Sequence, residues 1–181
     1  MLPPDYDRLA ALLEPQPAPL RAALDATDLP SGAVIRTFGD GQEEAADVLL
    51  CPASSVHAQA DPGALAALCA TLAAAVRPGG WVLLAAGPAP GAVSSGEALM
   101  DTHDGDGLKL VRSAVARVFG RMLRRDDFWL VARDNQPVET FEVRRDRALY
   151  SDEEVASAVA SAGLQVVAVE PGRVWRCQRI G

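Results

Sequence analysis

Residues 47–86 decide the fold of this chain, and they read DVLLCPASSVHAQADPGALAALCATLAAAVRPGGWVLLAA. A short apolar run, Val48 to Cys51, stops at Pro52, and a second apolar run begins at Trp81. Between the two runs, the segment from Pro62 to Val76 is rich in Ala and Leu, which favours a helix. Neither run alternates apolar and polar residues, so we expect both strands to be covered on both faces. The order strand, helix, strand predicts a βαβ unit with parallel strands.

The turn before the second strand reads Arg77-Pro78-Gly79-Gly80. Pro ends a helix because it lacks an N–H group, and paired glycines allow a sharp reversal. An Asp that opens an apolar strand, a loop with a His, a helix and this turn together resemble the central part of class I S-adenosylmethionine-dependent methyltransferases. The end of the chain resembles the same family, with a Tyr-Ser start, an acidic helix, an Ala-Gly pair and two final strands. The resemblance implies a Rossmann-like α/β fold whose sheet is mainly parallel, with an antiparallel C-terminal strand.

Length and composition narrow the classes of protein. With 181 residues we expect one domain, and the net charge of -7 argues against a general nucleic-acid binder. The N-terminus lacks the pattern of a signal peptide, and the longest apolar stretch, 63–76, is too short to span a membrane. No cysteine pair has the spacing of a metal site, and the run 101–107 lacks the closing acidic ligand of a calcium loop. We therefore expect a cytoplasmic protein without a metal, whose reduced thiols are Cys51, Cys69 and Cys177.

The chain divides into four predicted segments. Residues 1–32 hold two short helices, and 33–86 form the core of the sheet. Residues 87–150 form a loop, a lid helix and an insertion, and 151–181 form a helix and a hairpin. In the third segment, Val111, Val115, Val118 and Met122 make one apolar stripe of a helix over 108–125. Its remaining face is basic, which fits either a solvated surface or a lid over an anionic ligand.

The stretch Phe38-Gly39-Asp40-Gly41-Gln42-Glu43 allows two alignments to the family. In the first, Gly39 and Gly41 belong to the glycine loop that approaches the cofactor, and Glu43 takes the place of the third glycine. In the second, Gly39-Asp40 matches a Gly-Asp pair whose Asp faces the adenine of S-adenosylmethionine. The spacing to Asp47 favours the second alignment, because the family places two more strand–helix units after its glycine loop.

The second alignment implies that the sheet lacks its usual first strands. The glycine loop and the acidic residue that binds the ribose then have no counterpart. The strand near Ala33 becomes an edge with unpaired backbone groups. We expect the N-terminal helices, a protein partner or a second copy of the chain to cover this edge.

Candidate site residues follow the strand that ends at Cys51. Ligands of open α/β sheets bind at the carboxyl ends of the strands, so Cys51, Ser54, Ser55 and His57 lie where a ligand is expected. The resemblance adds Gly39, Asp40 and Gly41 as cofactor-binding candidates and His57 as a candidate general base. The alternative is that the serines are ordinary loop residues and that His57 is a solvated or helix-adjacent side chain.

Three hypotheses about function follow. The first is a methyltransferase-like domain whose S-adenosylmethionine site is incomplete or lost, a pseudoenzyme that acts as a partner or scaffold and forms a dimer through its sheet edge. The second is an active methyltransferase that acts on a small molecule. The third is a module that binds another small metabolite at the same edge of the sheet.

Overall fold

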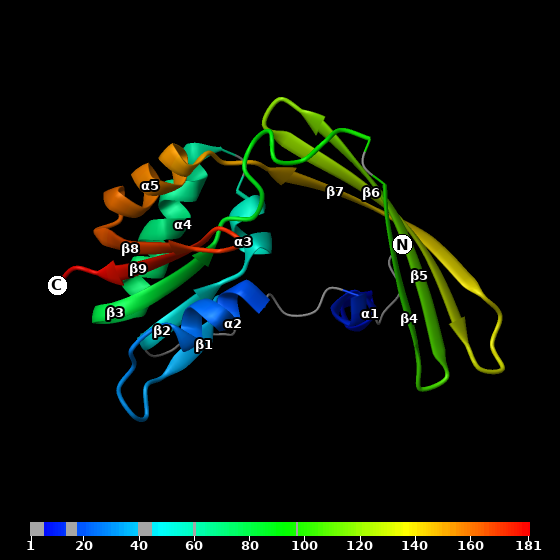
Figure 1. Cartoon of the computed structure of the whole chain (residues 1–181), viewed down its shortest axis with the longest axis horizontal. Helices are drawn as coiled ribbons and strands as arrows, with labels where there is room; N and C mark the ends of the chain where they lie inside the picture. The colour runs from blue at the N-terminus through cyan, green and yellow to red at the C-terminus, as the bar shows by residue number, and fades with distance from the viewer. Residues whose placement is uncertain (1–5, 14–17, 40–44, 60, 97) are drawn as a thin grey trace. The chain divides into compact units, whose positions relative to one another are not determined.

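The computed structural model of the chain describes residues 6–13, 18–39, 45–59, 61–96 and 98–181 (Figure 1). Contacts divide the chain into two compact units, where the sequence predicted one domain. We call the first the mixed-sheet unit, formed by Pro17–Ala92 and Arg147–Gly181. The second is the antiparallel unit, formed by Met1–Gln16 and Val93–Asp146.

The mixed-sheet unit contains a five-stranded sheet with the order β1-β2-β3-β9-β8. β1, β2 and β3 are parallel, whereas β9 is antiparallel to β3 and β8 is antiparallel to β9. The predicted βαβ unit, the C-terminal hairpin and the edge position of the first strand are thus confirmed. The strands are β1 (Ile35–Thr37), β2 (Ala46–Cys51), β3 (Val76–Ala85), β8 (Leu164–Glu170) and β9 (Val174–Arg179).

Helices pack on this sheet, and side-chain caps fix the start of two of them. α4 (Pro62–Ala75) begins after Asp61, whose side chain accepts a hydrogen bond from the Ala64 N–H. α5 (Asp152–Ser161) begins with a capping box between Ser151 and Glu154, and it packs against α4. α2 (Ala18–Asp25) lays Leu20, Ala23 and Leu24 on a core of strand residues, and α3 (Ala53–His57) follows β2. α2 therefore covers a face of the sheet formed by β2, β3 and β9.

Asp47 joins the three parallel strands near their amino ends. Its Oδ2 accepts a hydrogen bond from the Val34 N–H at 2.8 Å, and its Oδ1 accepts one from Arg77 Nη1 at 3.0 Å. A Cβ on Gly80 would lie 2.9 Å from the carbonyl oxygens of both Asp47 and Arg77. Glycine is required there because the chain passes too close to the neighbouring backbone for any side chain.

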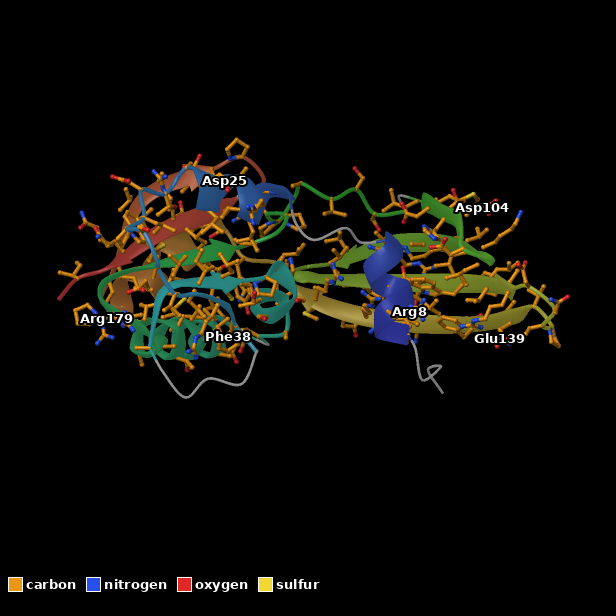
Figure 2. All side chains as sticks on the ribbon, turned by 90° about the horizontal axis from the view of Figure 1, so that it is seen from below. Arg8, Asp25, Phe38, Asp104, Glu139 and Arg179 are labelled. Carbon is orange, nitrogen blue, oxygen red and sulfur yellow. The ribbon has the colours of Figure 1, made fainter. Side chains whose placement is uncertain are left out.

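The antiparallel unit contains a four-stranded sheet with the order β4-β5-β6-β7. Helix α1 (Tyr6–Leu13) packs on one face, where Leu9 meets a core that includes Leu110, Trp129 and Val131. Figure 2 shows α1, labelled at Arg8, across these strands. The strands are β4 (Ala98–Gly105), β5 (Leu108–Phe119), β6 (Met122–Arg133) and β7 (Glu139–Ala148).

The predicted lid helix over 108–125 is wrong. Residues 108–119 form strand β5, and two-residue turns lie on either side of it, at Asp106-Gly107 and Gly120-Arg121. Positive φ angles at Asp106, Gly107 and Gly120 allow these tight turns. The loop predicted before this helix is also wrong in its last part, because 98–105 form strand β4. The segment predicted as an insertion forms strands β6 and β7, which pair with each other.

Candidate functional site

The carboxyl ends of the three parallel strands meet at one edge of the mixed sheet. Thr37 lies opposite Leu50 in β2, and the Phe38 N–H continues the ladder with a 2.8 Å hydrogen bond to the Leu50 carbonyl. Gly39 follows with a φ of +108°. The structure brings the candidate residues Gly39, Cys51, Ser54 and His57 to this edge, whereas Asp40 and Gly41 lie outside the described residues.

Cys51 is fully buried at the end of β2. Burial, with a smaller contribution from the nearby Cys69, raises the pKa of its thiol to about 12. The thiol is therefore protonated at neutral pH and is a poor nucleophile, because the thiolate is the reactive form. Ser54, in contrast, is exposed on α3.

His57 is buried, with 3% of its surface exposed. Its Nδ1–H donates a 2.6 Å hydrogen bond to the Ala148 carbonyl, since a carbonyl oxygen accepts only. Burial lowers the pKa of the imidazole, and the Arg147 and Arg173 charges lower it further against the opposing effect of the Ala148 bond. His57 is therefore neutral at pH 7.

The other ring nitrogen of His57 faces Gly87, just beyond the end of β3. A Cβ on Gly87 would lie 2.1 Å from Nε2, and the φ of Gly87 is +65°. Only glycine fits this position, because both the space and the backbone conformation exclude a side chain. The imidazole is thus held between the Ala148 carbonyl and the Gly87 backbone.

Two further side chains complete the same arrangement. The buried Tyr150 hydroxyl lies 2.7 Å from the Gln59 carbonyl oxygen, to which it donates. Arg173 donates from Nη1 to the Gly87 carbonyl at 2.8 Å and from Nη2 to the Tyr150 carbonyl at 3.0 Å. These bonds tie the segment before α5 to the loop after α3 and to the end of β3. We call this set the edge lock, and its members are His57, Gly87, Tyr150 and Arg173.

Sequence reasoning missed three members of the edge lock. Gly87 was counted as the start of a loop, and Tyr150 as the start of the last helix. Their partners lie far away in sequence, since His57 and Ala148 are separated by 91 positions. No local spacing indicates such a contact, although a Gly at the carboxyl end of a parallel strand is a signal of close backbone approach.

A second group of buried polar atoms lies in the antiparallel unit. Asp127 Oδ1 accepts a 2.6 Å hydrogen bond from Arg125 Nε. The Arg112 guanidinium lies 5.5 Å from the centre of the Trp129 ring, and Phe141 stacks on this ring at 5.6 Å between ring centres. Among the described residues, four buried atoms of this group have no hydrogen-bond partner, and they are Tyr6 Oη, Arg125 Nη2, Asp127 Oδ2 and Trp129 Nε1.

Within the described parts of the chain, no group of three or more His, Cys, Asp or Glu side chains is arranged to hold a metal ion. Nor do those parts contain a helix long and apolar enough to cross a membrane.

No protein-family model and no curated protein matches the chain. Solved structures do match. DesVI of Streptomyces venezuelae is 18% identical with a TM-score of 0.82, over 98% of this chain and 98% of that chain. The sugar N-methyltransferase KedS8 from Streptoalloteichus sp ATCC 53650 is 18% identical with a TM-score of 0.79, and the match covers 100% of this chain and 95% of that chain.

A third structure is that of CalS10, an amino pentose methyltransferase from Micromonospora echinaspora, determined with S-adenosylmethionine bound. It is 23% identical with a TM-score of 0.67, and the match spans 77% of this chain but only 60% of that chain. The chain therefore has a class I S-adenosylmethionine-dependent methyltransferase-like fold, as the sequence predicted. The matches to DesVI and KedS8 extend over both units of the chain.

Proposed function

We propose that this chain is a methyltransferase-fold protein without methyl-transfer activity, which serves as a partner or scaffold for another protein. The observation that carries the proposal is the edge lock. The side chains of His57, Tyr150 and Arg173, at the carboxyl ends of the parallel strands, bind the chain itself, where a ligand site would need them free. In this proposal His57 is a structural residue, and its neutral imidazole fixes the segment before α5.

The described residues do not fit S-adenosylmethionine. β1 is the edge strand, so no further described strand lies beyond it to carry an acidic residue for the ribose. In the first alignment of the sequence, Glu43 takes the place of the third glycine and differs from it in size and charge. We infer that the first strands of the sheet and the cofactor site have been lost together.

Calorimetric titration of the whole chain with S-adenosylmethionine and with its demethylated product tests the proposal. We expect no saturable binding with a Kd below about 0.1 mM, which corresponds to a binding free energy of about -5 kcal/mol. Saturable binding would overturn it. In that case Asp40→Ala, compared with the exposed control Asp28→Ala, tests whether the candidate residues Gly39, Asp40 and Gly41 form the site.

The second candidate is an active methyltransferase that acts on the amino group of a sugar. It is favoured by the match to the sugar N-methyltransferase KedS8, which extends over the entire chain. His57 is then the general base, a role typically worth 10²–10⁴-fold in rate. Formation of demethylated cofactor in the presence of amino sugars, with His57→Ala as the variant, distinguishes this candidate from the first.

The third candidate, a binder of another metabolite at the same edge, predicts binding without turnover.

The partner in the first proposal is expected at the free edge of β1. Ile35 is 45% exposed there, and an unpaired edge strand is a template for pairing with another chain. Helix α2 lies on a face of the sheet and leaves this edge to a partner. Replacing Ile35 with Pro, which removes a backbone N–H, should abolish partner capture without unfolding an edge strand.

A further inference from the structure

The chain passes between its two units at three places, of which the first, 16–17, lies outside the described residues. The other two passages are Ala92–Val93 and Asp146–Arg147. We call residues 86–92 the outgoing connection and residues 147–152 the returning connection, because the mixed-sheet unit adjoins the two passages through them. Whatever holds these connections restrains the attachment of the antiparallel unit.

His57 contacts both connections. Its Nδ1–H donates to the Ala148 carbonyl in the returning connection, and its Nε2 packs against the backbone of Gly87 in the outgoing connection. The histidine itself belongs to α3, which is part of neither connection. One imidazole therefore bridges two segments that strands β4, β5 and β6 separate in sequence.

Arg173, in the turn between β8 and β9, makes the same bridge. Nη1 donates to the Gly87 carbonyl and Nη2 to the Tyr150 carbonyl, and the Arg173 carbonyl accepts a 3.0 Å hydrogen bond from the Ala86 N–H. Its φ is +56°, which is uncommon for a residue with a Cβ. Strained backbone of this kind persists where the surrounding structure enforces it, and it is frequent in switch regions. Two side chains from different elements thus hold the same pair of connections.

The outgoing connection contains a hinge just beyond the edge lock. Residues 90–92 are exposed, and 86–92 belong to no helix or strand. Gly91 has a φ of +84°, and nothing lies within 4 Å of a Cβ built there. Hinges are typically a few loop residues that absorb changes in φ and ψ. In the returning connection, by contrast, Ala148, Leu149 and Tyr150 are buried. The edge lock is therefore what limits movement at the hinge.

The closed lock requires a neutral imidazole. The charged groups that act on His57 are Arg147 and Arg173, both cations, while the carboxylate of Asp152 at the start of α5 binds Arg173 and is 69% exposed. The other titratable side chains at this edge, Cys51 and Tyr150, are neutral at pH 7. With the described residues, Nε2 forms no hydrogen bond. A proton on Nε2 would add a buried donor without an acceptor and a third positive charge beside two others, so an imidazolium does not fit the closed lock.

We propose that the edge lock is a proton-operated clamp, which restrains the antiparallel unit while His57 is neutral and releases both connections when the imidazole takes up a proton. The proton comes from the solvent and binds Nε2, and the imidazolium then leaves the space between the Ala148 carbonyl and Gly87. The hinge at Gly91 becomes free to move once Gly87 is released. This role does not depend on whether the chain transfers methyl groups.

Hydrogen–deuterium exchange of the whole chain, followed by mass spectrometry at pH 7.5 and at pH 5, tests the proposal. Each rate is divided by the intrinsic exchange rate at the same pH. We expect peptides from 86–92 and 147–152 to exchange at least tenfold faster at pH 5, while peptides from α4 remain protected. Arg173→Leu removes bonds to both connections without a titrating group, so these peptides should exchange fast at both pH values.

The two histidines of the chain provide a matched pair of variants. His57→Asn keeps a side-chain N–H donor but cannot take up a proton, so its connections should show no such change. His103→Asn carries the same substitution on β4 and should retain the full change. The proposal is overturned if the rates of the wild type do not rise at pH 5. It is equally overturned if the rise persists in His57→Asn or disappears in His103→Asn.

Spin labels measure whether the clamp restrains the antiparallel unit. Thr140→Cys on β7 and Ala160→Cys on α5 place one exposed label in each unit, and the three native cysteines are buried. The distance distribution from pulsed electron paramagnetic resonance should broaden at pH 5, but not when His57→Asn is added. A distribution that stays equally narrow while the connections exchange fast overturns the proposal, because the lock would then have no hold on this unit.

Discussion

Replacing Gly87 with Ala tests the edge lock directly. The new Cβ would lie 2.1 Å from His57 Nε2, and Ala would have to adopt a φ of +65°. The left-handed backbone costs about 1–2 kcal/mol for a residue with a Cβ. Displacing the imidazole costs a further 1–3 kcal/mol as a packing strain. Losing the bond to the Ala148 carbonyl adds about 0.5–1.5 kcal/mol, so Gly87→Ala should lower the free energy of unfolding by roughly 2.5–6.5 kcal/mol.

A double-mutant cycle separates the contact from the backbone strain. In a His57→Ala background the new Cβ meets no imidazole, so Gly87→Ala should cost only the backbone term of about 1–2 kcal/mol. The coupling energy between the two positions is therefore about 1.5 kcal/mol or more, a value expected only for residues in contact. Urea unfolding followed by circular dichroism at pH 7.5 measures all four members of the cycle.

Gly91 provides the matched control. Its φ is +84°, but nothing lies within 4 Å of a Cβ built there. Gly91→Ala should thus cost about 1–2 kcal/mol in both backgrounds. The account of the edge lock is refuted if Gly87→Ala costs the same, within about 0.5 kcal/mol, with and without the imidazole.

Three further predictions concern stability and reactivity. Because burial lowers the pKa of His57 below the value in the unfolded chain, the unfolded state takes up a proton first as the pH falls. The stability contributed by the neutral imidazole is fully present above pH 6.5 and is lost as the pH falls through the folded pKa. The difference in stability between the wild type and His57→Ala should therefore shrink as the pH falls below 6.5 in urea titrations. Asp127→Ala should cost about 3–5 kcal/mol because it leaves the partly buried Arg125 without its carboxylate, whereas Asp126→Ala on the more exposed side of the same strand should cost much less. Burial raises the pKa of all three thiols, so a thiol reagent should react only in denaturant with Cys51, Cys69 and Cys177.

Much of the mixed-sheet unit was predictable because its signals are local. Apolar runs bounded by Pro and Gly predicted the parallel strands, and the acidic stretch after Tyr150-Ser151 predicted α5. The antiparallel unit was mispredicted because Val111, Val115 and Val118 fit the stripe of a helix as well as the surface of a strand. β-branched residues favour strands, and the Asp-Gly pair before Leu108 is a hairpin signal that the helical stripe concealed.

The site was predictable only in its position. The rule that ligands bind at the carboxyl ends of parallel strands placed Cys51 and His57 at the correct edge. Their environments depend on segments that return to this edge from far along the chain, chiefly the Ala148 carbonyl and Arg173. A sequence shows which side chains follow the carboxyl ends of the strands. The accessibility of each side chain depends on the segments, distant in sequence, that pack against it.

The accessibility of His57, and not its charge, distinguishes the two leading candidate functions. A neutral imidazole at pH 7 is what a general base requires, so the lowered pKa of His57 is compatible with catalysis. A base must also reach its substrate, and here one ring nitrogen binds a carbonyl while the other packs against Gly87. The chain contains one other histidine, the partly buried His103 on β4, which serves as an internal control. Diethyl pyrocarbonate followed by peptide mass mapping should modify His103 at least tenfold faster than His57. Equal rates would show that the edge opens in solution, and the active methyltransferase would then become the better account of this fold.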